Sequence, residues 1–154
     1  MNIFDRLILV GATGFGLGRI PMAPGTFGTL AAIPLIWLMA WLDKGAMAFF
    51  LVGLILLSIY VADRAETLMG EKDPGSIVID EIAGFCITMT LVPIGWGSIV
   101  LGFVAFRGFD ILKPVPVKYF ENKFSGGAGI VLDDIMAGVL AALVLKFLYS
   151  FGLF

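Results

Sequence analysis

The chain contains no histidine and only one cysteine, and these absences exclude several kinds of active site. Without histidine there is no Ser-His-Asp triad, no phosphohistidine nucleophile and no histidine-ligated zinc. Cys86 lies within an apolar run and has no second cysteine to pair with, so we interpret it as a small buried hydrophobic residue. Any catalysis must therefore use carboxylates, with help from lysine, arginine, hydroxyls, backbone amides and a metal ion.

Charged residues are also scarce. Only 14% of the 154 residues are charged, the net charge is −2, and no basic stripe is present, so we expect no nucleic-acid partner. In contrast, 60% of the residues are hydrophobic and the mean hydropathy is +1.04. Together with 20 glycines, which membrane helices tolerate better than soluble ones, this composition predicts an integral membrane protein with a single domain, residues 1–154.

The apolar runs predict an all-α fold, a polytopic membrane bundle of about four transmembrane spans with short cytoplasmic helices. The expected spans cover residues 27–42, 46–62, 82–93 with a return over 98–106, and 135–154. Residues 7–17 are too few to cross a bilayer, so we expect an N-terminal interfacial or re-entrant helix there. A loop is expected at residues 18–26, where Pro21, Pro24 and Gly25 act as helix breakers.

Positive charge gathers in two polar segments, around residues 64–72 and 107–123. The breaks at residues 43–45 and 95–97 carry almost no net positive charge. By the positive-inside rule, the two charged segments are cytoplasmic and the two breaks lie outside. Every group that could perform chemistry is then expected to face the cytoplasm.

An acidic motif occurs twice, as Ile-Val-Ile-Asp-Glu-Ile over residues 77–82 and as Ile-Val-Leu-Asp-Asp-Ile over residues 130–135. Each copy precedes a long apolar run, where we expect a helix to enter the membrane. Helix N-terminal charge, worth ~0.3–1 kcal/mol, explains one acid per helix but poorly explains adjacent pairs at both. Acids at membrane depth are functional by default, so the two pairs predict a site for Mg²⁺. The four residues are Asp80, Glu81, Asp133 and Asp134.

Helix geometry adds detail to this site. Neighbouring side chains on a helix point about 100° apart, so one acid of a pair can face a metal while the other orients a water or a lysine. Gly84 follows Asp80 by four residues and Gly138 follows Asp134 by four, so each glycine leaves space on the same face as an acid.

A third motif is Arg107-x-x-Asp110-x-x-Lys113 followed by Pro114. Steps of three align the side chains along one helical face, and the proline ends the helix. A local salt-bridge ladder would contribute only about 0.3–0.5 kcal/mol per pair. We interpret Asp110 as a further metal ligand, and Arg107 and Lys113 as binders of phosphate oxygens.

Two glycine-rich segments are weaker candidates for binding an anion, because turns before a helix expose backbone amides. One is the loop over residues 125–129, which contains Gly126 and Gly127. The other, residues 24–29, contains Thr29 and also Thr26, which is a plausible helix N-cap.

Two further acids, Glu66 and Asp73, are second-tier candidates. Asp73 stands beside Pro74 and Gly75, so it is equally typical of a turn former.

Four blocks of this sequence together resemble the phosphatidylglycerophosphatase A family. They are Pro-Gly-Thr-x-Gly-Thr at 24–29, Lys-Asp-Pro-Gly-Ser-Ile-Val-Ile-Asp-Glu-x-x-Gly at 72–84, Phe-Arg-x-x-Asp-x-x-Lys-Pro-x-Pro at 106–116 and Gly-Gly-x-Gly-Ile-Val-Leu-Asp-Asp-x-x-Ala-Gly at 126–138. The resemblance implies a multi-pass, Mg²⁺-dependent phosphatase of the bacterial cytoplasmic (inner) membrane. Its substrate in the lipid bilayer would be phosphatidylglycerophosphate and its product phosphatidylglycerol.

The resemblance also implies roles for individual residues. The metal and catalytic centre would be formed by Asp80, Glu81, Asp110, Asp133 and Asp134. Arg107 and Lys113 would hold the phosphate. The sequence leaves open whether one or two metal ions bind, which carboxylate is the base, and the oligomeric state.

A different class of protein also fits part of the pattern. A small transporter or cation channel could use the doubled acidic motif as an ion path. The acids, however, stand at expected helix entrances rather than mid-span, and cationic residues accompany them. A CDP-alcohol phosphotransferase would need a longer aspartate pattern that this chain lacks.

Overall fold

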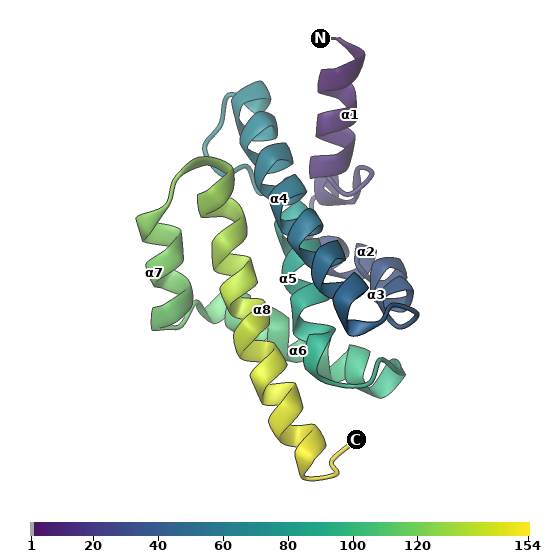
Figure 1. Ribbon diagram of the computed structural model, residues 1–154. Helices are drawn as coiled ribbons and strands as arrows, with labels where there is room; N and C mark the ends of the chain where they lie inside the picture. The colour runs from purple at the N-terminus through teal and green to yellow at the C-terminus, as the bar shows by residue number, and fades with distance from the viewer. Residues whose placement is uncertain (1) are drawn as a thin grey trace.

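The computed structural model describes residues 2–154, and within that range it consists of helices and connecting turns (Figure 1). The α-helices are α1 (Ile3–Ala12), α2 (Pro24–Ala31), α3 (Ile33–Met39), α4 (Lys44–Met69), α5 (Ile79–Thr88), α6 (Trp96–Leu112), α7 (Val115–Lys123) and α8 (Gly126–Ser150). Short 3₁₀ turns occur at Leu17–Arg19 and Met89–Leu91. The expected all-α fold is confirmed.

Helix α5 is the centre of the bundle. It packs most extensively against α8, and also against α4, α2 and α6. Helix α8 in turn contacts α4, α6 and α7, so α7 lies along its outer side in Figure 1. The core between α5, α6 and α8 is filled by side chains that are fully buried, including Phe85, Phe106 and Leu145.

Two helices, α4 and α8, are long and apolar enough to cross a membrane. Only 22% of the apolar stretch of α4 is buried within the protein, and its outer face exposes Phe49, Val52, Leu56 and Leu57. So large an apolar surface indicates contact with lipid or a partner rather than with water. The fold therefore supports membrane association through two helices.

The N-terminal boundaries differ from those expected. Helix α1 begins at Ile3 rather than at residue 7, because Asn2 accepts a hydrogen bond from the Asp5 amide (2.8 Å) and Asp5 accepts one in return. Pro24 does not break a helix but begins α2, where its fixed φ suits the first turn. The expectation that Thr26 is an N-cap is therefore wrong, since Ala23 precedes the helix and Thr26 lies within its first turn.

The expected first span, residues 27–42, is two short helices instead of one. Helices α2 and α3 meet at Ala32, and Pro34 lies in the first turn of α3. A proline there cannot donate the backbone hydrogen bond that would continue α2 without interruption. Asp43 then caps α4 by accepting hydrogen bonds from the amides of Gly45 (2.8 Å) and Ala46 (3.0 Å).

Helix α8 begins nine residues earlier than the expected start at residue 135. The glycine-rich segment is its first turn rather than a loop, so Asp133 and Asp134 lie about two turns inside the helix. The cause is a tertiary contact: Gly127 donates its amide hydrogen to Asp63 Oδ1 (3.1 Å) on α4. A carboxylate at this position satisfies a helix N-terminal amide and favours a helix despite the low propensity of glycine.

Helices α5 and α8 approach each other closely at Gly84 and Gly138. A Cβ atom on Gly84 would lie 2.7 Å from the backbone oxygen of Asp134, and one on Gly138 would collide with the backbone oxygen of Gly84. Only hydrogen fits at both positions, as in other small-residue contacts between helices. This contact fixes the two acidic motifs beside each other.

Candidate active site

The acidic motifs meet at a cavity of about 310 Å³ between α2, α5, α6, α8 and the turn before α5. Its carboxylates belong to Asp73, Asp80, Glu81, Asp110, Asp133 and Asp134. Its cationic groups belong to Arg107 and Lys113. The first-turn residues Pro24 and Gly25 of α2 form part of the wall.

Three of the carboxylates form one cluster. Asp80 and Glu81 of α5 and Asp134 of α8 each place an oxygen within 4.8 Å of the others. Adjacent acids on α5 thus bring carboxylate oxygens close together, although neighbouring side chains on a helix start about 100° apart. The close approach of α5 and α8 at their glycines supplies the third carboxylate.

Each member of this cluster has a buried oxygen without a hydrogen-bond partner among the described residues. These atoms are Asp80 Oδ1, Glu81 Oε2 and Asp134 Oδ2. A buried carboxylate oxygen without a partner is costly, and three that converge would repel one another. A hard divalent cation such as Mg²⁺ would satisfy them, since it prefers oxygen ligands. The donor set therefore fits the expected metal.

The other two expected ligands are paired with cations. Asp110 forms a short ion pair with Arg107 one turn away on α6, and Arg107 Nη1 also lies 3.8 Å from Glu81 Oε1. Asp133 Oδ2 lies 3.0 Å from Lys113 Nζ. The five acids predicted to share one role thus divide into a cluster of three and two partners of basic groups.

Lys113 is not on the same helical face as Asp110, contrary to the sequence expectation. Helix α6 ends at Leu112, and Lys113 adopts a left-handed conformation with φ of 43°. Its Nζ donates to Asp133 of α8 and, at 2.8 Å, to Glu121 of α7. Burial would lower the pKa of Lys113, but the two carboxylates outweigh it and the pKa is raised. Lys113 thus remains charged at neutral pH.

The weaker candidates occupy the periphery. Thr26, Thr29, Gly126, Gly127 and Glu66 do not line the central cavity. The Thr29 hydroxyl donates to the Gly25 carbonyl oxygen (2.7 Å) within α2, and the Gly127 amide binds Asp63.

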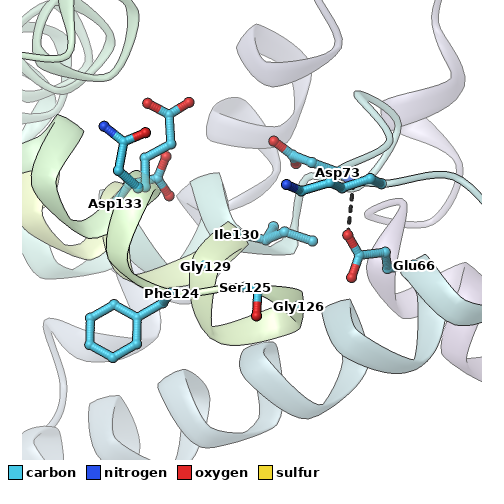
Figure 2. Close-up of a pocket in the computed structure, with 11 residues that line it drawn as sticks. Glu66, Asp73, Phe124, Ser125, Gly126, Gly129, Ile130 and Asp133 are labelled. Carbon is cyan, nitrogen blue, oxygen red and sulfur yellow. Dashed lines mark hydrogen bonds between the residues drawn. The ribbon is translucent and has the colours of Figure 1, made fainter.

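Figure 2 shows a neighbouring cavity of about 260 Å³ that Gly126 lines together with Glu66 and Asp73. Glu66 Oε1 accepts a hydrogen bond from the Asp73 amide (2.9 Å), drawn as a dashed line in Figure 2. Asp73 and Asp133 border both cavities.

Three residues with clear structural roles were not among the individual site residues that the sequence predicted. Asp63 caps α8 and Glu121 holds Lys113, and each resembles an ordinary solvated acid in the sequence. Gly25 belongs to a motif, but only the structure shows its contact: a Cβ there would lie 2.8 Å from Arg107 Nη1 and would collide with Glu81.

Comparison with known proteins identifies the family. The model of the family described as phosphatidylglycerophosphatase A matches residues 10–149. The chain belongs to the phosphatidylglycerophosphatase A family. All eight charged residues of the central cavity lie inside the matched segment.

Three relatives illustrate this membership. The chain is 41% identical over 138 residues to the phosphatidylglycerophosphatase A of Escherichia coli, covering 89% of this chain and 80% of the relative. It is 41% identical over 135 residues to the phosphatidylglycerophosphatase A of Haemophilus influenzae, covering 86% and 83%. It is 37% identical over 147 residues to a putative phosphatidylinositol-3-phosphatase of Bacteroides thetaiotaomicron, covering 90% of each. No solved structure matches the chain.

The four sequence blocks that resemble the phosphatidylglycerophosphatase A family converge on the central cavity. The first forms the start of α2, the second the turn before α5 and its first turns, the third the end of α6, and the fourth the first half of α8. Blocks separated by up to about a hundred residues in the chain therefore come together to form a single site in the fold.

Removing the ammonium of Lys113 is expected to destabilise this family member. In Lys113→Met, the carboxylate of Asp133, whose side chain is 8% exposed, loses its cation and remains buried. We expect a loss of about 1–3 kcal/mol, the range for leaving a buried polar group unsatisfied. Glu121→Gln is the matched control, because that side chain is 39% exposed and its pair is worth at most about 1 kcal/mol. Thermal unfolding in detergent measures the loss of stability in both variants. An equal loss in the two would contradict the role of Lys113 as the partner of the buried Asp133 carboxylate.

Proposed function

We propose that this protein hydrolyses the terminal phosphate monoester of phosphatidylglycerophosphate, giving phosphatidylglycerol and inorganic phosphate. The observation that carries the proposal is the cluster of three buried carboxylates with unpartnered oxygens, next to two cationic side chains. The names of two relatives support this substrate, and the name of the third also denotes a phosphatase acting on a phospholipid.

The charge of the cavity supports a requirement for Mg²⁺. Within the described part of the chain, six carboxylates and two cationic groups line it. Such an excess of negative charge would repel a phosphate dianion. When bound by Asp80, Glu81 and Asp134, Mg²⁺ would neutralise charge on the phosphoryl oxygens and act as a Lewis acid.

The chain's own groups would perform the remaining steps. Arg107 and Lys113 bind the phosphate oxygens, with Asp110 and Asp133 holding the two cations in position. A carboxylate of the site accepts a proton from the attacking water as its oxygen bonds to phosphorus. The bond between phosphorus and the glycerol oxygen breaks in line, and that oxygen takes up a proton. We favour direct hydrolysis over a phosphorylated aspartate.

We also propose a topology and orientation for the protein. The chain forms one domain, which crosses the inner membrane about four times and opens its cavity to the cytoplasm. Helices α4 and α8 are two of these four spans, the shorter apolar segment Pro24–Met39 is a third, and α5 with its return α6 is counted together as the fourth. Lysines and an arginine near the ends of α6 and α7 support the cytoplasmic placement.

The test is phosphate release by the purified protein in detergent from phosphatidylglycerophosphate, with Mg²⁺ and with EDTA. We expect release that stops when EDTA is added and returns when excess Mg²⁺ is restored. No release from a folded sample in either condition would reject the phosphatase and favour the ion-path alternative. Release that persists in EDTA would reject the metal requirement alone.

Gly25→Ala is expected to lower this phosphate release by about 10-fold or more. The added methyl group would meet both Glu81 and Arg107, and displacements of about 1 Å in a catalytic site can reduce rates by ~100-fold. Gly97→Ala is the control, because a Cβ atom there meets nothing within 4 Å. Initial rates at saturating lipid measure the effect. Equal rates for the two variants would show that the contact with α2 does not shape the site.

A further inference from the structure

A separate apolar groove lies beside the active site, between the start of α3 and the face of α6. Its volume is about 270 Å³, and every residue that lines it is aliphatic or aromatic. We propose that this groove holds one acyl chain of the lipid substrate and thereby orients the phosphate in the central cavity, which is the catalytic cavity of the proposed function. The inference rests on the function proposed above.

One wall of the groove lies on the same face of α6 as Arg107 of the catalytic cavity. Trp96, Val100, Phe103 and Val104 line the groove from α6. Their spacing of three or four residues places them on one face of the helix, and Arg107 is the next position on that face. The distance along the axis from Trp96 to Val104 is about 12 Å at 1.5 Å per residue. A chain that follows this face ends about one turn from Arg107.

The helix that contributes Leu30 to the opposite wall also contributes residues to the catalytic cavity. Leu30 of α2 and Ile33 of α3 line the groove, while Pro24 and Gly25 at the start of α2 line the catalytic cavity. Gly25 and Leu30 are five residues apart, or about 7.5 Å along the helix. Two helices therefore each carry groove residues and, about one to one and a half turns away, residues of the catalytic cavity.

The groove is open on its outer side, where a chain could enter from the bilayer. The α6 residues Trp96, Val100 and Val104 are 66%, 59% and 64% exposed. Among residues 2–154, no charged residue lines the groove, so it offers no ionic partner for a headgroup. Its position about one helical turn from a cavity that carries two cations matches a ligand with an apolar chain at one end and a phosphate at the other.

The physical role of the groove is orientation rather than affinity. Lipid tails are as apolar as the groove walls, so moving a chain from lipid into the groove changes its apolar environment little. A chain held along α6 does, however, limit the directions from which its headgroup reaches Arg107. Such positioning raises the rate of a reaction that needs in-line attack.

The test uses tryptophan substitutions whose larger side chains fill the groove, and it compares the activity of each variant on two substrates. Val104→Trp and Val100→Trp are assayed with phosphatidylglycerophosphate carrying sixteen-carbon chains and with the analogue carrying four-carbon chains, which are too short to occupy the groove. We expect the ratio of kcat/KM for the long-chain lipid to that for the short-chain analogue to fall about 10-fold in both variants. Val52→Trp is the control: Val52 is 56% exposed on α4 and lines neither the groove nor the catalytic cavity. Its ratio should equal that of the parent.

Other outcomes would overturn the inference. An unchanged ratio in both groove variants means that no acyl chain lies there during turnover. A change in the oligomeric mass of both variants, measured by light scattering in detergent, would show that the groove instead receives a second copy of the chain.

A binding measurement separates this inference from the proposed function. The lipid carrying a photoreactive diazirine midway along one acyl chain is crosslinked to the protein in EDTA, and the labelled peptides are identified. Labelling of α6 between Trp96 and Val104 that Val100→Trp abolishes supports the groove even if no phosphate is released. Labelling spread evenly over the outer faces of α4 and α8 would reject the groove, whatever the activity.

Discussion

Asp134→Asn is expected to reduce phosphate release by more than about 100-fold, with little loss of folded protein. Asp134 is 4% exposed, belongs to the cluster of three carboxylates, and has a buried oxygen without a partner. Replacing it by an amide removes a charged metal ligand, and single groups that stabilise charge in a transition state typically contribute ~100- to 1,000-fold. Stability should hold or rise in the absence of metal, because one of the converging negative charges is removed.

Two further variants sharpen this experiment. Asp80→Asn should behave as Asp134→Asn does, because both acids belong to the cluster. Glu71→Gln removes a carboxylate that lies outside the central cavity and should leave the rate near that of the parent. The apparent affinity for Mg²⁺, measured from the rate at increasing metal concentration, should fall in Asp134→Asn and Asp80→Asn but not in Glu71→Gln. Near-normal rates in both Asp134→Asn and Asp80→Asn would show that these two acids are not metal ligands.

Gly138→Ala is expected to destabilise the protein by about 2 kcal/mol or more and to abolish activity. The added Cβ would collide with the backbone oxygen of Gly84, and a backbone contact cannot be relieved by rotating a side chain. Overpacking of this kind typically costs about 1–3 kcal/mol, and the helices must separate to relieve it. Separation would also move Asp134 away from Asp80 and Glu81, so stability and catalysis should fall together.

Gly53→Ala is the matched control for this variant. Gly53 lies within the other long apolar helix, α4, and a Cβ atom there meets nothing within 4 Å. An alanine in a helix interior is favoured over glycine by about 0.5–1 kcal/mol, so this variant should be as stable as the parent or more so. Thermal unfolding and phosphate release on the same detergent samples measure both effects. If Gly138→Ala unfolds at the parent's temperature, the close packing of α5 on α8 is not required.

The fold class followed from the sequence because apolar runs of this length and composition are compatible with little other than helices. The exact helix boundaries did not follow, since they depend on partners elsewhere in the chain. The glycines at the start of α8 have low helix propensity, and they form a helix where Asp63 on α4 caps them. Pro24 was expected to break a helix and instead begins one, because the chain turns at Ala23 just before it.

The sequence alone determined which residue types are available for chemistry and which motifs carry them: a chain without histidine, with two acidic copies and an Arg-x-x-Asp-x-x-Lys segment. These follow from composition and spacing, which need no coordinates. Tertiary structure alone decided how those acids divide. Asp80, Glu81 and Asp134 converge because α5 and α8 touch at two glycines, and Asp133 of α8 is paired with Lys113, which follows the end of α6. The pair of Asp110 with Arg107 is local to α6, and the spacing of three residues already allowed it. The cluster of three acids and the pairing of Asp133 depend on distances between helices far apart in the chain, and local sequence pattern carries no information about those distances.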